Sequence, residues 1–228
     1  MENQINQSGG AINSPLHRFL LFILPTFFRL LYHQFSWTYD WVASIVSLGE
    51  WNNWVSSVLP DIFGPNVLEI GFGPGHLQAA INQRNILAFG LDESIQMVNI
   101  TRHRLLDLGL IPRLARGDAQ ILPFANESFR QVVMTFPAEF LLNKTTFKEI
   151  HRVLVNGGSV IILPLAWITG RKLMERAVAW LNYITGEAPA WNETSLQQFK
   201  DLGFIVSWEM ISLHSSKILI IQLNKPGL

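Results

Sequence analysis

The sequence predicts an α/β fold in which helices cover both faces of a mainly parallel sheet. From about residue 67 to residue 164, short apolar strands alternate with helical stretches, which is the pattern of a parallel sheet with crossover helices. Residues 204–213 and 216–223 then form two strands joined by a short turn, which predicts a closing antiparallel hairpin. With 228 residues, the chain suits one such domain plus an extension.

Composition excludes several classes of function. The chain is 49% hydrophobic and 15% charged with a formal net charge of zero, so no bulk electrostatic attraction to nucleic acid is expected. It contains no cysteine, which rules out disulfides, thiolate zinc sites and a catalytic thiol. This composition is compatible with the cytoplasm, and we expect no metal site.

The N-terminal region differs from the rest of the chain. Residues 1–15 are polar and are expected to be a disordered tail. Residues 16–31 are the most apolar run, but the run is shorter than the roughly 20 residues needed to cross a bilayer, and Pro25 would kink it. A secretory signal is also a poor fit, because Glu2 lies in a weakly basic beginning and no small-residue cleavage site follows.

Residues 32–59 are rich in aromatic residues and contain half of the eight tryptophans: Trp37, Trp41, Trp51 and Trp54. Apolar residues at helical spacing predict a helix from residue 32 to about 46, closed at Gly49, and a second helix over residues 51–59 that ends at Pro60. We predict that residues 16–60 form a helical lid over a pocket. The alternative is that these helices only cover one end of the sheet.

The remaining elements follow in order. The boundaries come from apolar runs, from Ser94 as a helix cap, and from the Asn156-Gly157-Gly158 turn. The predicted strands are 67–70, 86–91, 112–115, 131–136 and 159–164; the predicted helices are 76–81, 94–108, 138–154, 171–184 and 194–202.

A glycine turn follows the first strand and indicates a ligand site. Gly71, Gly73 and Gly75 allow a tight turn with bare backbone, and the helix start after it presents free N–H groups. The dinucleotide fingerprint would need a third glycine where His76 stands, and the Gly-Lys-Ser/Thr of a phosphate loop is absent. What remains is acid-x-Gly-x-Gly-x-Gly beginning at Glu69, which suits a ligand with an amino acid and a nucleoside but no phosphate.

At these residues the sequence resembles the class I S-adenosylmethionine-dependent methyltransferases, most broadly those of ubiquinone and menaquinone synthesis. Two further stretches resemble motifs of that family: Leu122-Pro123-Phe124, and Glu149 with Arg152-Val153-Leu154-Val155-Asn156-Gly157-Gly158, where Asn156 replaces a proline. The resemblance implies a three-layer Rossmann-like domain over residues 61–228, with a seven-stranded sheet of order 3-2-1-4-5-7-6 whose strand 7 is antiparallel. It also implies S-adenosylmethionine as cofactor and S-adenosylhomocysteine as product.

The resemblance assigns roles to three acids that follow the first three strands. Glu69 would interact with the methionine end of the cofactor, Asp92 with both ribose hydroxyls, and Asp118 with the adenine amino group. The alternatives from the residues alone are a helix cap for Asp92 and a turn residue for Asp118. The complete predicted cofactor set is Tyr39, Glu69, Gly71, Phe72, Gly73, Gly75, Asp92, Glu93, Asp118, Ala119 and Thr135.

The acceptor is predicted to be a small, apolar molecule resembling a quinone, a phenol or a lipid, and Phe136, Pro137 and Phe140 are expected to line its pocket. The Asn/Asp-Pro-Pro-aromatic motif of amino-methylating DNA enzymes is absent after the fourth strand, which argues against flipped-base chemistry. Methyl transfer is an in-line displacement that depends on positioning. His33 and His151 are the candidate bases, although a lone histidine is more often structural.

Two other functions stay open at this stage. One is a binding or assembly module that keeps the fold without catalysis, and the other is a different group transfer from the same cofactor, such as aminopropyl transfer. Residues 16–31 either roof the pocket, rest on a membrane surface, or contact a second subunit in a homodimer. The expected location is cytoplasmic, with or without peripheral contact with a membrane.

Overall fold

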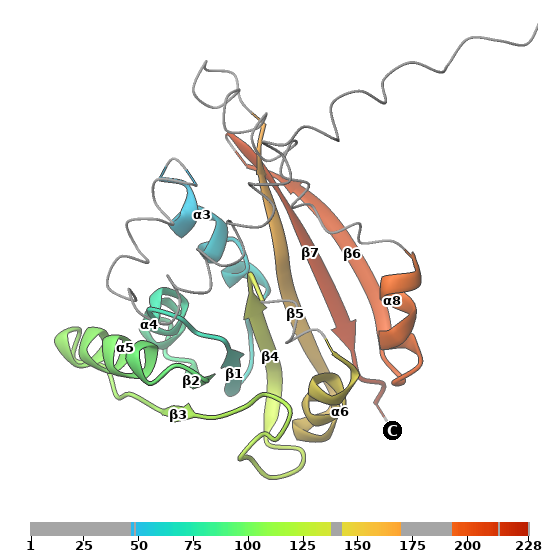
Figure 1. Cartoon of the computed structure of the whole chain (residues 1–228), viewed down its shortest axis with the longest axis horizontal. Coiled ribbons are helices and arrows are strands. Elements are labelled where there is room, and N and C mark those ends of the chain that lie inside the picture. Colours follow the sequence, from blue (N-terminus) through green and yellow to red (C-terminus); the bar gives the residue numbers. More distant parts are fainter. Residues whose placement is uncertain (1–46, 48, 138–142, 170–192, 214, 228) are drawn as a thin grey trace, which may run out of the picture.

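The structure is a computed structural model, and it describes residues 47, 49–137, 143–169, 193–213 and 215–227. These residues form a seven-stranded sheet of order β3-β2-β1-β4-β5-β7-β6 (Figure 1). The strands are β1 (Asn66–Ile70), β2 (Leu87–Asp92), β3 (Leu114–Arg116), β4 (Phe129–Thr135), β5 (Leu154–Ile168), β6 (Ile205–Ser212) and β7 (Ser216–Asn224). The pairs among β1 to β5 are parallel, whereas β7 is antiparallel to both β5 and β6, which confirms the predicted sheet.

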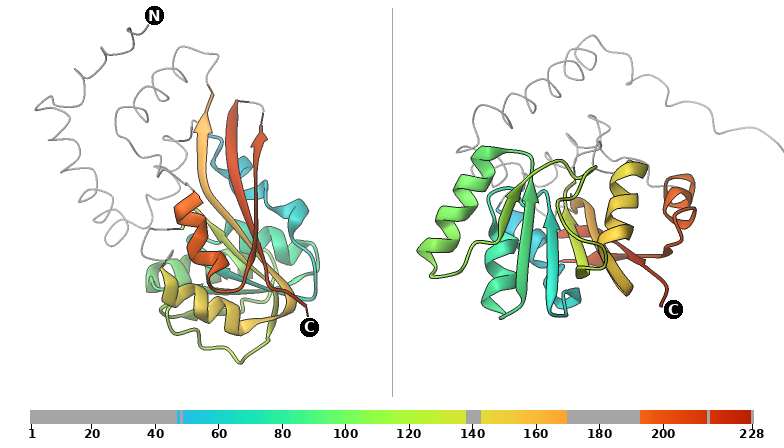
Figure 2. Two further views of the ribbon diagram at one scale, coloured as in Figure 1. Left: turned by 90° about the vertical axis from the view of Figure 1, so that its right-hand side faces the viewer. Right: turned by 90° about the horizontal axis from the view of Figure 1, so that it is seen from below.

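Helices cover both faces of this sheet, which makes three layers (Figure 2). The described helices are α3 (Trp51–Ser56), the 3₁₀ turn η2 (Leu59–Asp61), α4 (His76–Gln83), α5 (Ile95–Asp107), α6 (Lys144–Val153) and α8 (Glu193–Lys200). Alternate residues of a strand point to opposite faces, so Val132 and Met134 pack in the core with α6 and α8, while Val133 packs with α3 and α4. The predicted helices 32–46 and 171–184 lie outside the described residues.

The start of the described chain is tied to its end. The indole Nε1 of Trp54 in α3 donates to the Oγ of Ser216 at the start of β7 (2.7 Å), and both side chains are buried. Val58 and Leu59 belong to the same core cluster. The buried side chains of this segment, which include Trp54, Val58 and Leu59, therefore pack onto the sheet as part of its core.

One predicted turn has a different form in the structure. Asn156-Gly157-Gly158 was expected to separate a helix from a strand beginning at residue 159, but β5 already begins at Leu154, where α6 ends. Phe129 pairs with Leu154 whereas Gln131 pairs with Ser159, so β5 carries extra residues opposite β4. Gly157 takes φ +72° within this bulge, and a Cβ on Gly158 would meet the Val155 carbonyl oxygen at 2.8 Å. The glycines thus form an irregularity inside a strand.

Other boundaries shift by a few residues. Ser94 caps α5 as predicted, because its Oγ accepts from the N–H of Met97. The helix predicted over 51–59 ends at Ser56, and Pro60 lies in the short 3₁₀ turn. Helix α6 begins at Lys144, capped by Asn143, and residues 138–142 lie outside the described chain.

Candidate functional site

The glycine turn after β1 exposes backbone in a conformation that side chains rarely adopt. Gly71 and Gly73 have φ of +73° and +52°. The N–H of Gly71 donates to the carbonyl of Leu91, which ties the turn to the end of β2 (2.8 Å). A Cβ added at Gly73 would meet no atom within 4 Å, so the backbone there borders open space. The turn can therefore let a ligand lie directly against the main chain.

Both polar backbone groups of Gly73 are held by side chains. Its N–H donates to Oδ2 of Asp92 (2.9 Å), and its carbonyl accepts from the hydroxyl of Thr101 on α5 (2.7 Å). Asp92 also accepts from the N–H of Ser94 through Oδ1 (2.9 Å), whereas the helix cap considered for it above is Ser94, whose Oγ accepts from the N–H of Met97. A carboxylate has about four lone-pair sites, so these two bonds leave capacity on Asp92 for a ligand.

Thr101→Val should destabilise the protein by about 1–2 kcal/mol. The substitution keeps the shape of the side chain but leaves the Gly73 carbonyl without the donor that now holds it, and Thr101 is fully buried. Urea unfolding measures the change. Thr145→Val, at an exposed position of α6, is the matched control and should stay within about 0.5 kcal/mol of the parent. Equal effects of the two substitutions would contradict the role given to Thr101.

Glu69 is a buried acid beside the turn. It is 1% exposed, and its Oε2 has no hydrogen-bond partner in the part of the chain that the structure describes. Burial raises the pKa of Glu69 to about 8; a hydrogen bond with the Gln78 side chain opposes this shift, and the charge of Asp92 adds to it. Burial also raises the pKa of Asp92, although its hydrogen bonds with the Ser94 and Gly73 N–H groups oppose the increase. Two acids that are costly to ionise in the free protein suit a ligand that brings positive charge.

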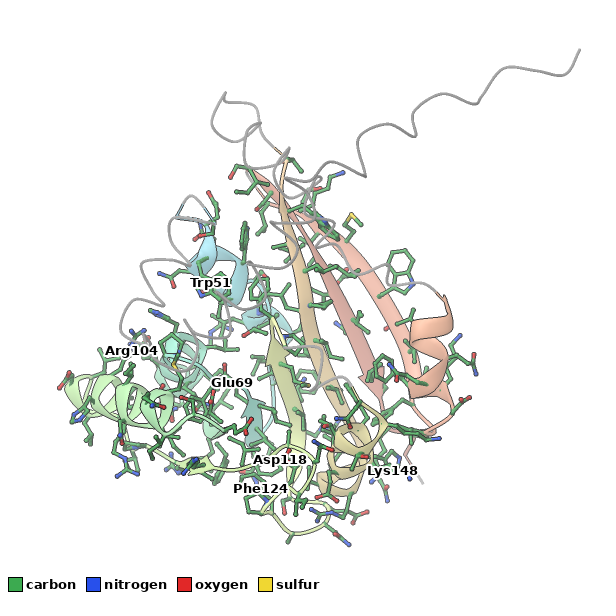
Figure 3. The ribbon with its side chains drawn as sticks, viewed as in Figure 1. Trp51, Glu69, Arg104, Asp118, Phe124 and Lys148 are labelled. Atoms are coloured by element: carbon green, nitrogen blue, oxygen red, sulfur yellow. The ribbon has the colours of Figure 1, made fainter. Side chains whose placement is uncertain are left out.

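These groups border one small pocket. Its volume is about 30 Å³, which holds about one water molecule, so a larger ligand must extend across its mouth. The pocket is lined by Trp51, Val55, Glu69, Gly71, Phe72, Gly73, Pro74, His76, Leu77 and Thr135. Figure 3 shows Trp51 on α3 and Glu69 on β1.

An aromatic pair forms one side of this region. The ring of Trp51 stacks on that of Phe136, with centroids 4.5 Å apart and 25° between the planes. Phe136 follows β4 and has φ +48°, an uncommon conformation for a residue with a side chain, while its N–H donates to the Leu163 carbonyl (2.7 Å). The predicted pocket residue Phe136 therefore lies against a residue that lines the pocket, and Pro137 follows it, partly buried.

The structure brings together five of the predicted cofactor residues, Glu69, Gly71, Phe72, Gly73 and Thr135, and sets Asp92 against the turn. Packing also explains two residues that had been chosen for ligand contact. A Cβ on Gly75 would meet Thr101 Cγ2 at 2.3 Å, and the Phe72 ring fills the space beside Gly90.

Asp118 and Ala119 lie on the loop after β3, next to the end of β2. The N–H of Gly117 donates to the Asp92 carbonyl (3.1 Å), which brings this loop beside Asp92. Asp118 is exposed, and its Oδ1 accepts from the N–H of Gln120 (2.8 Å), so the turn role considered for it is present. Glu93 is exposed after β2. None of these three residues lines the pocket.

The candidate base His151 lies away from the pocket. His151 lies on α6 with its ring edge-on to Phe204, 5.1 Å between centroids, and its carbonyl accepts from Lys225 Nζ (3.0 Å). Burial, with the nearby charge of Lys225, lowers the pKa of His151. The pocket lining does not include it, so the geometry gives no support to a role as base. His33, Tyr39 and Phe140 lie outside the described residues.

Five residues that line the pocket are absent from the predicted site: Trp51, Val55, Pro74, His76 and Leu77. Trp51 was noted only as part of an aromatic region, and His76 only as the residue that excludes a dinucleotide fingerprint. The guanidinium of Arg104 on α5 donates to Nδ1 of His76 (Figure 3 labels Arg104). The position of His76 in the sequence could have identified it as a pocket residue, because it is the first residue of α4, directly after the glycine turn.

The described residues carry neither a membrane-spanning helix nor a metal-binding cluster. None of the helices in residues 47–227 that the structure describes combines the length and the apolar character needed to span a bilayer. Within the same described ranges, no three acidic or histidine side chains converge as a metal site would require.

Comparison with known proteins finds methyltransferases among the matches. Residues 67–158 match the model of a methyltransferase domain. The ubiquinone/menaquinone biosynthesis C-methyltransferase UbiE of Legionella pneumophila (strain Corby) is 32% identical over 151 residues, which cover 60% of this chain and 58% of that protein. This chain thus matches less than two thirds of that relative's length.

Two longer alignments agree with this match. The demethylmenaquinone methyltransferase of Thermotoga maritima is 26% identical over 217 residues, 83% of this chain and 93% of that protein. The crystal structure of a SAM-dependent methyltransferase from Methanosarcina mazei superposes with a TM-score of 0.57 at 16% identity, over 75% of this chain and 98% of that chain. At this identity the superposition establishes the fold alone.

Proposed function

Since the chain carries a domain of the class I methyltransferase type, we propose that it binds S-adenosylmethionine and transfers the methyl group to a small, apolar acceptor. The single observation that carries the proposal is the buried Glu69 carboxyl, whose Oε2 is unpartnered among the described residues and which borders the open backbone of Gly73. The similarity to quinone methyltransferases of Legionella pneumophila and Thermotoga maritima supports the same assignment.

The residues present fit the proposed cofactor. Glu69 would face the methionine end, which carries an ammonium and a sulfonium. Attraction between these positive charges and the ionised carboxylate would offset the free-energy cost of ionising Glu69 in a buried position. Gly71 and Gly73 would lie under the ligand, and Asp92 would accept from the ribose hydroxyls with the lone pairs that remain. Asp118, on the neighbouring loop, would accept from the adenine amino group.

Chemically, the bound cofactor supplies an electrophilic methyl group on a positively charged sulfur. The protein's part is to orient the acceptor for in-line displacement and to keep water away. Trp51, Val55 and Phe136 provide an apolar and aromatic wall near Glu69 and Thr135. Such a wall suits a flat ring, which supports a quinone- or phenol-like acceptor over a strongly polar one.

The predicted lid, residues 16–60, completes the proposal. Trp51 and Val55 near its end line the pocket, which supports a lid formed by this segment. We propose that the segment roofs the acceptor and that the protein works in the cytoplasm, with the apolar run 16–31 available for a membrane surface or for a second copy of the chain.

Titration calorimetry with S-adenosylmethionine and S-adenosylhomocysteine tests the first half of the proposal, with NAD as a ligand that should not bind. We expect micromolar binding of both methionine-derived ligands. Transfer of a labelled methyl group to quinol, phenol and lipid acceptors tests the second half. Absence of binding would overturn the proposal, while binding without transfer to any acceptor would favour the non-catalytic binding module.

A further inference from the structure

The last turn of α6 carries a charged pair with contacts beyond its own helix. Glu149 and Arg152 are three residues apart and therefore lie on the same side of α6. Arg152 donates from Nε to one oxygen of Glu149 (2.8 Å) and from Nη2 to the other (2.7 Å), which is the two-point geometry that arginine forms with carboxylates. The Arg152 hydrogen bond lowers the pKa of Glu149, so the pair is charged at neutral pH.

The same two side chains bind the loop between β3 and β4. Arg152 Nη1 donates to the Phe124 carbonyl (2.8 Å) and to Oδ1 of Asn126 (2.9 Å), and Nη2 donates to the Leu122 carbonyl (3.0 Å). Glu149 Oε2 accepts from the N–H of Leu122 (2.9 Å). Both backbone polar groups of Leu122 are therefore held by one ion pair.

This attachment is close to Asp118. The N–H of Ile121 donates to the Asp118 carbonyl (3.1 Å), so a single turn joins the acid to the clamped Leu122. On the other side, Gly117 is bonded to the end of β2. Leu122 is buried, and the Phe124 ring packs edge-on against Phe129, with centroids 4.9 Å apart. Figure 3 shows Asp118 and Phe124 on this loop and Lys148 on α6.

An ordinary surface ion pair would not explain this arrangement. Pairs three residues apart on an exposed helix contribute little to stability, and here both side chains are partly exposed, at 31% and 21%. Four further hydrogen bonds from this pair reach a loop about 25 to 30 residues earlier in the chain. That loop has no regular secondary structure after the Asp118 turn, so side chains must fix its position.

We infer that Glu149 and Arg152 are positioning residues, which hold Asp118 where it can accept a hydrogen bond from the exocyclic amino group of a purine ligand. The inference rests on the proposed function, because it takes the adenine of S-adenosylmethionine as that purine. Neither side chain lines the pocket, so both act through the loop.

The test compares two ligands that differ at one position of the base. S-adenosylhomocysteine carries the 6-amino donor, and S-inosylhomocysteine carries a carbonyl oxygen there, which an aspartate oxygen repels. The parent protein should prefer the adenosine ligand by tenfold or more in calorimetry, since a site built for a hydrogen bond rejects an analogue that lacks the donor. Arg152→Met should reduce this preference to about threefold or less, because it releases both loop carbonyls.

Two variants complete the comparison. Lys148→Met, an exposed position on the same helix, removes a cation without touching the loop and should keep the full preference. Arg152→Lys keeps the charge but cannot form the two-point contact, so its preference should fall between those of the parent and Arg152→Met. Titrations are run well below the melting temperature of each variant, so that only folded protein is compared.

The outcomes separate the inference from its premise. A lower melting temperature with an unchanged preference in Arg152→Met would show a purely structural pair and overturn the inference. Equal binding of both ligands by the parent would also overturn it, while the proposed cofactor would stand. Failure of the parent to bind either ligand would instead overturn the proposed function.

Discussion

Replacing Asp92 by alanine is expected to weaken S-adenosylhomocysteine binding by about 100-fold or more. The carboxylate holds the N–H of Gly73 through one oxygen and the N–H of Ser94 through the other, so its loss frees the turn that would lie under the ligand. It also removes the proposed acceptor for the ribose hydroxyls. Each hydrogen bond to a charged group contributes roughly 1.5–3 kcal/mol, and two or more are lost together.

Calorimetric titration of Asp92→Ala measures this loss. Asp107→Ala, at an exposed position near the end of α5, is the control and should bind like the parent. Asp92→Asn preserves the shape but offers a single acceptor oxygen, so its affinity should lie between those of the parent and Asp92→Ala. If Asp92→Ala bound the ligand within about threefold of Asp107→Ala, the acid would serve only to hold the local backbone.

The second large effect is a dependence of stability on pH that Glu69 creates. The carboxyl has a pKa of about 8 in the folded protein and close to 4.5 in the unfolded chain. Between these values the folded protein keeps a proton that the unfolded chain has released, so the free energy of unfolding falls as pH rises from about 4.5 to 8. The difference between the two pKa values corresponds to a decrease of roughly 4–5 kcal/mol in the free energy of unfolding by pH 8.5, relative to its value at low pH. The raised pKa of Asp92 acts in the same direction.

Glu69→Gln should remove most of this dependence, because glutamine has nearly the same shape and does not titrate. The variant should resemble the parent near pH 5 and exceed its stability by several kcal/mol at pH 8.5. Urea unfolding across pH 5–9 measures the effect, and Glu209→Gln, on the exposed surface of β6, is the matched control. Parallel pH profiles for parent and Glu69→Gln would show that the buried carboxyl is not the source.

The fold was predictable where local pattern and chain order are sufficient. The apolar runs, the Ser94 cap and the family resemblance gave all seven strands and their order, and the glycine turn lies at the predicted position. Positions that depend on distant packing were not accessible. Gly75 is a glycine because of Thr101, 26 residues later, and no local pattern distinguishes that contact from contact with a ligand.

The site was predictable to a similar degree. Acids at the ends of neighbouring strands are readable from the sequence, and the structure places Glu69 in the pocket lining and Asp92 against the glycine turn. The pairing of Trp51 with Phe136 joins residues 85 positions apart, and a helical pattern cannot tell which end of the sheet His151 will reach. The Asn156-Gly157-Gly158 turn residues formed a bulge because strand pairing continued through them.

The bond from Trp54 to Ser216 has a consequence for how the protein is made. Strand β7 lies between β5 and β6, although it follows both of them in the chain. Until β7 is synthesised, one edge of β5 and the core beside α3 lack the cover that this strand provides, so the nascent chain exposes an apolar sheet edge. Fragments that end before residue 216 should therefore depend on chaperones to stay in solution.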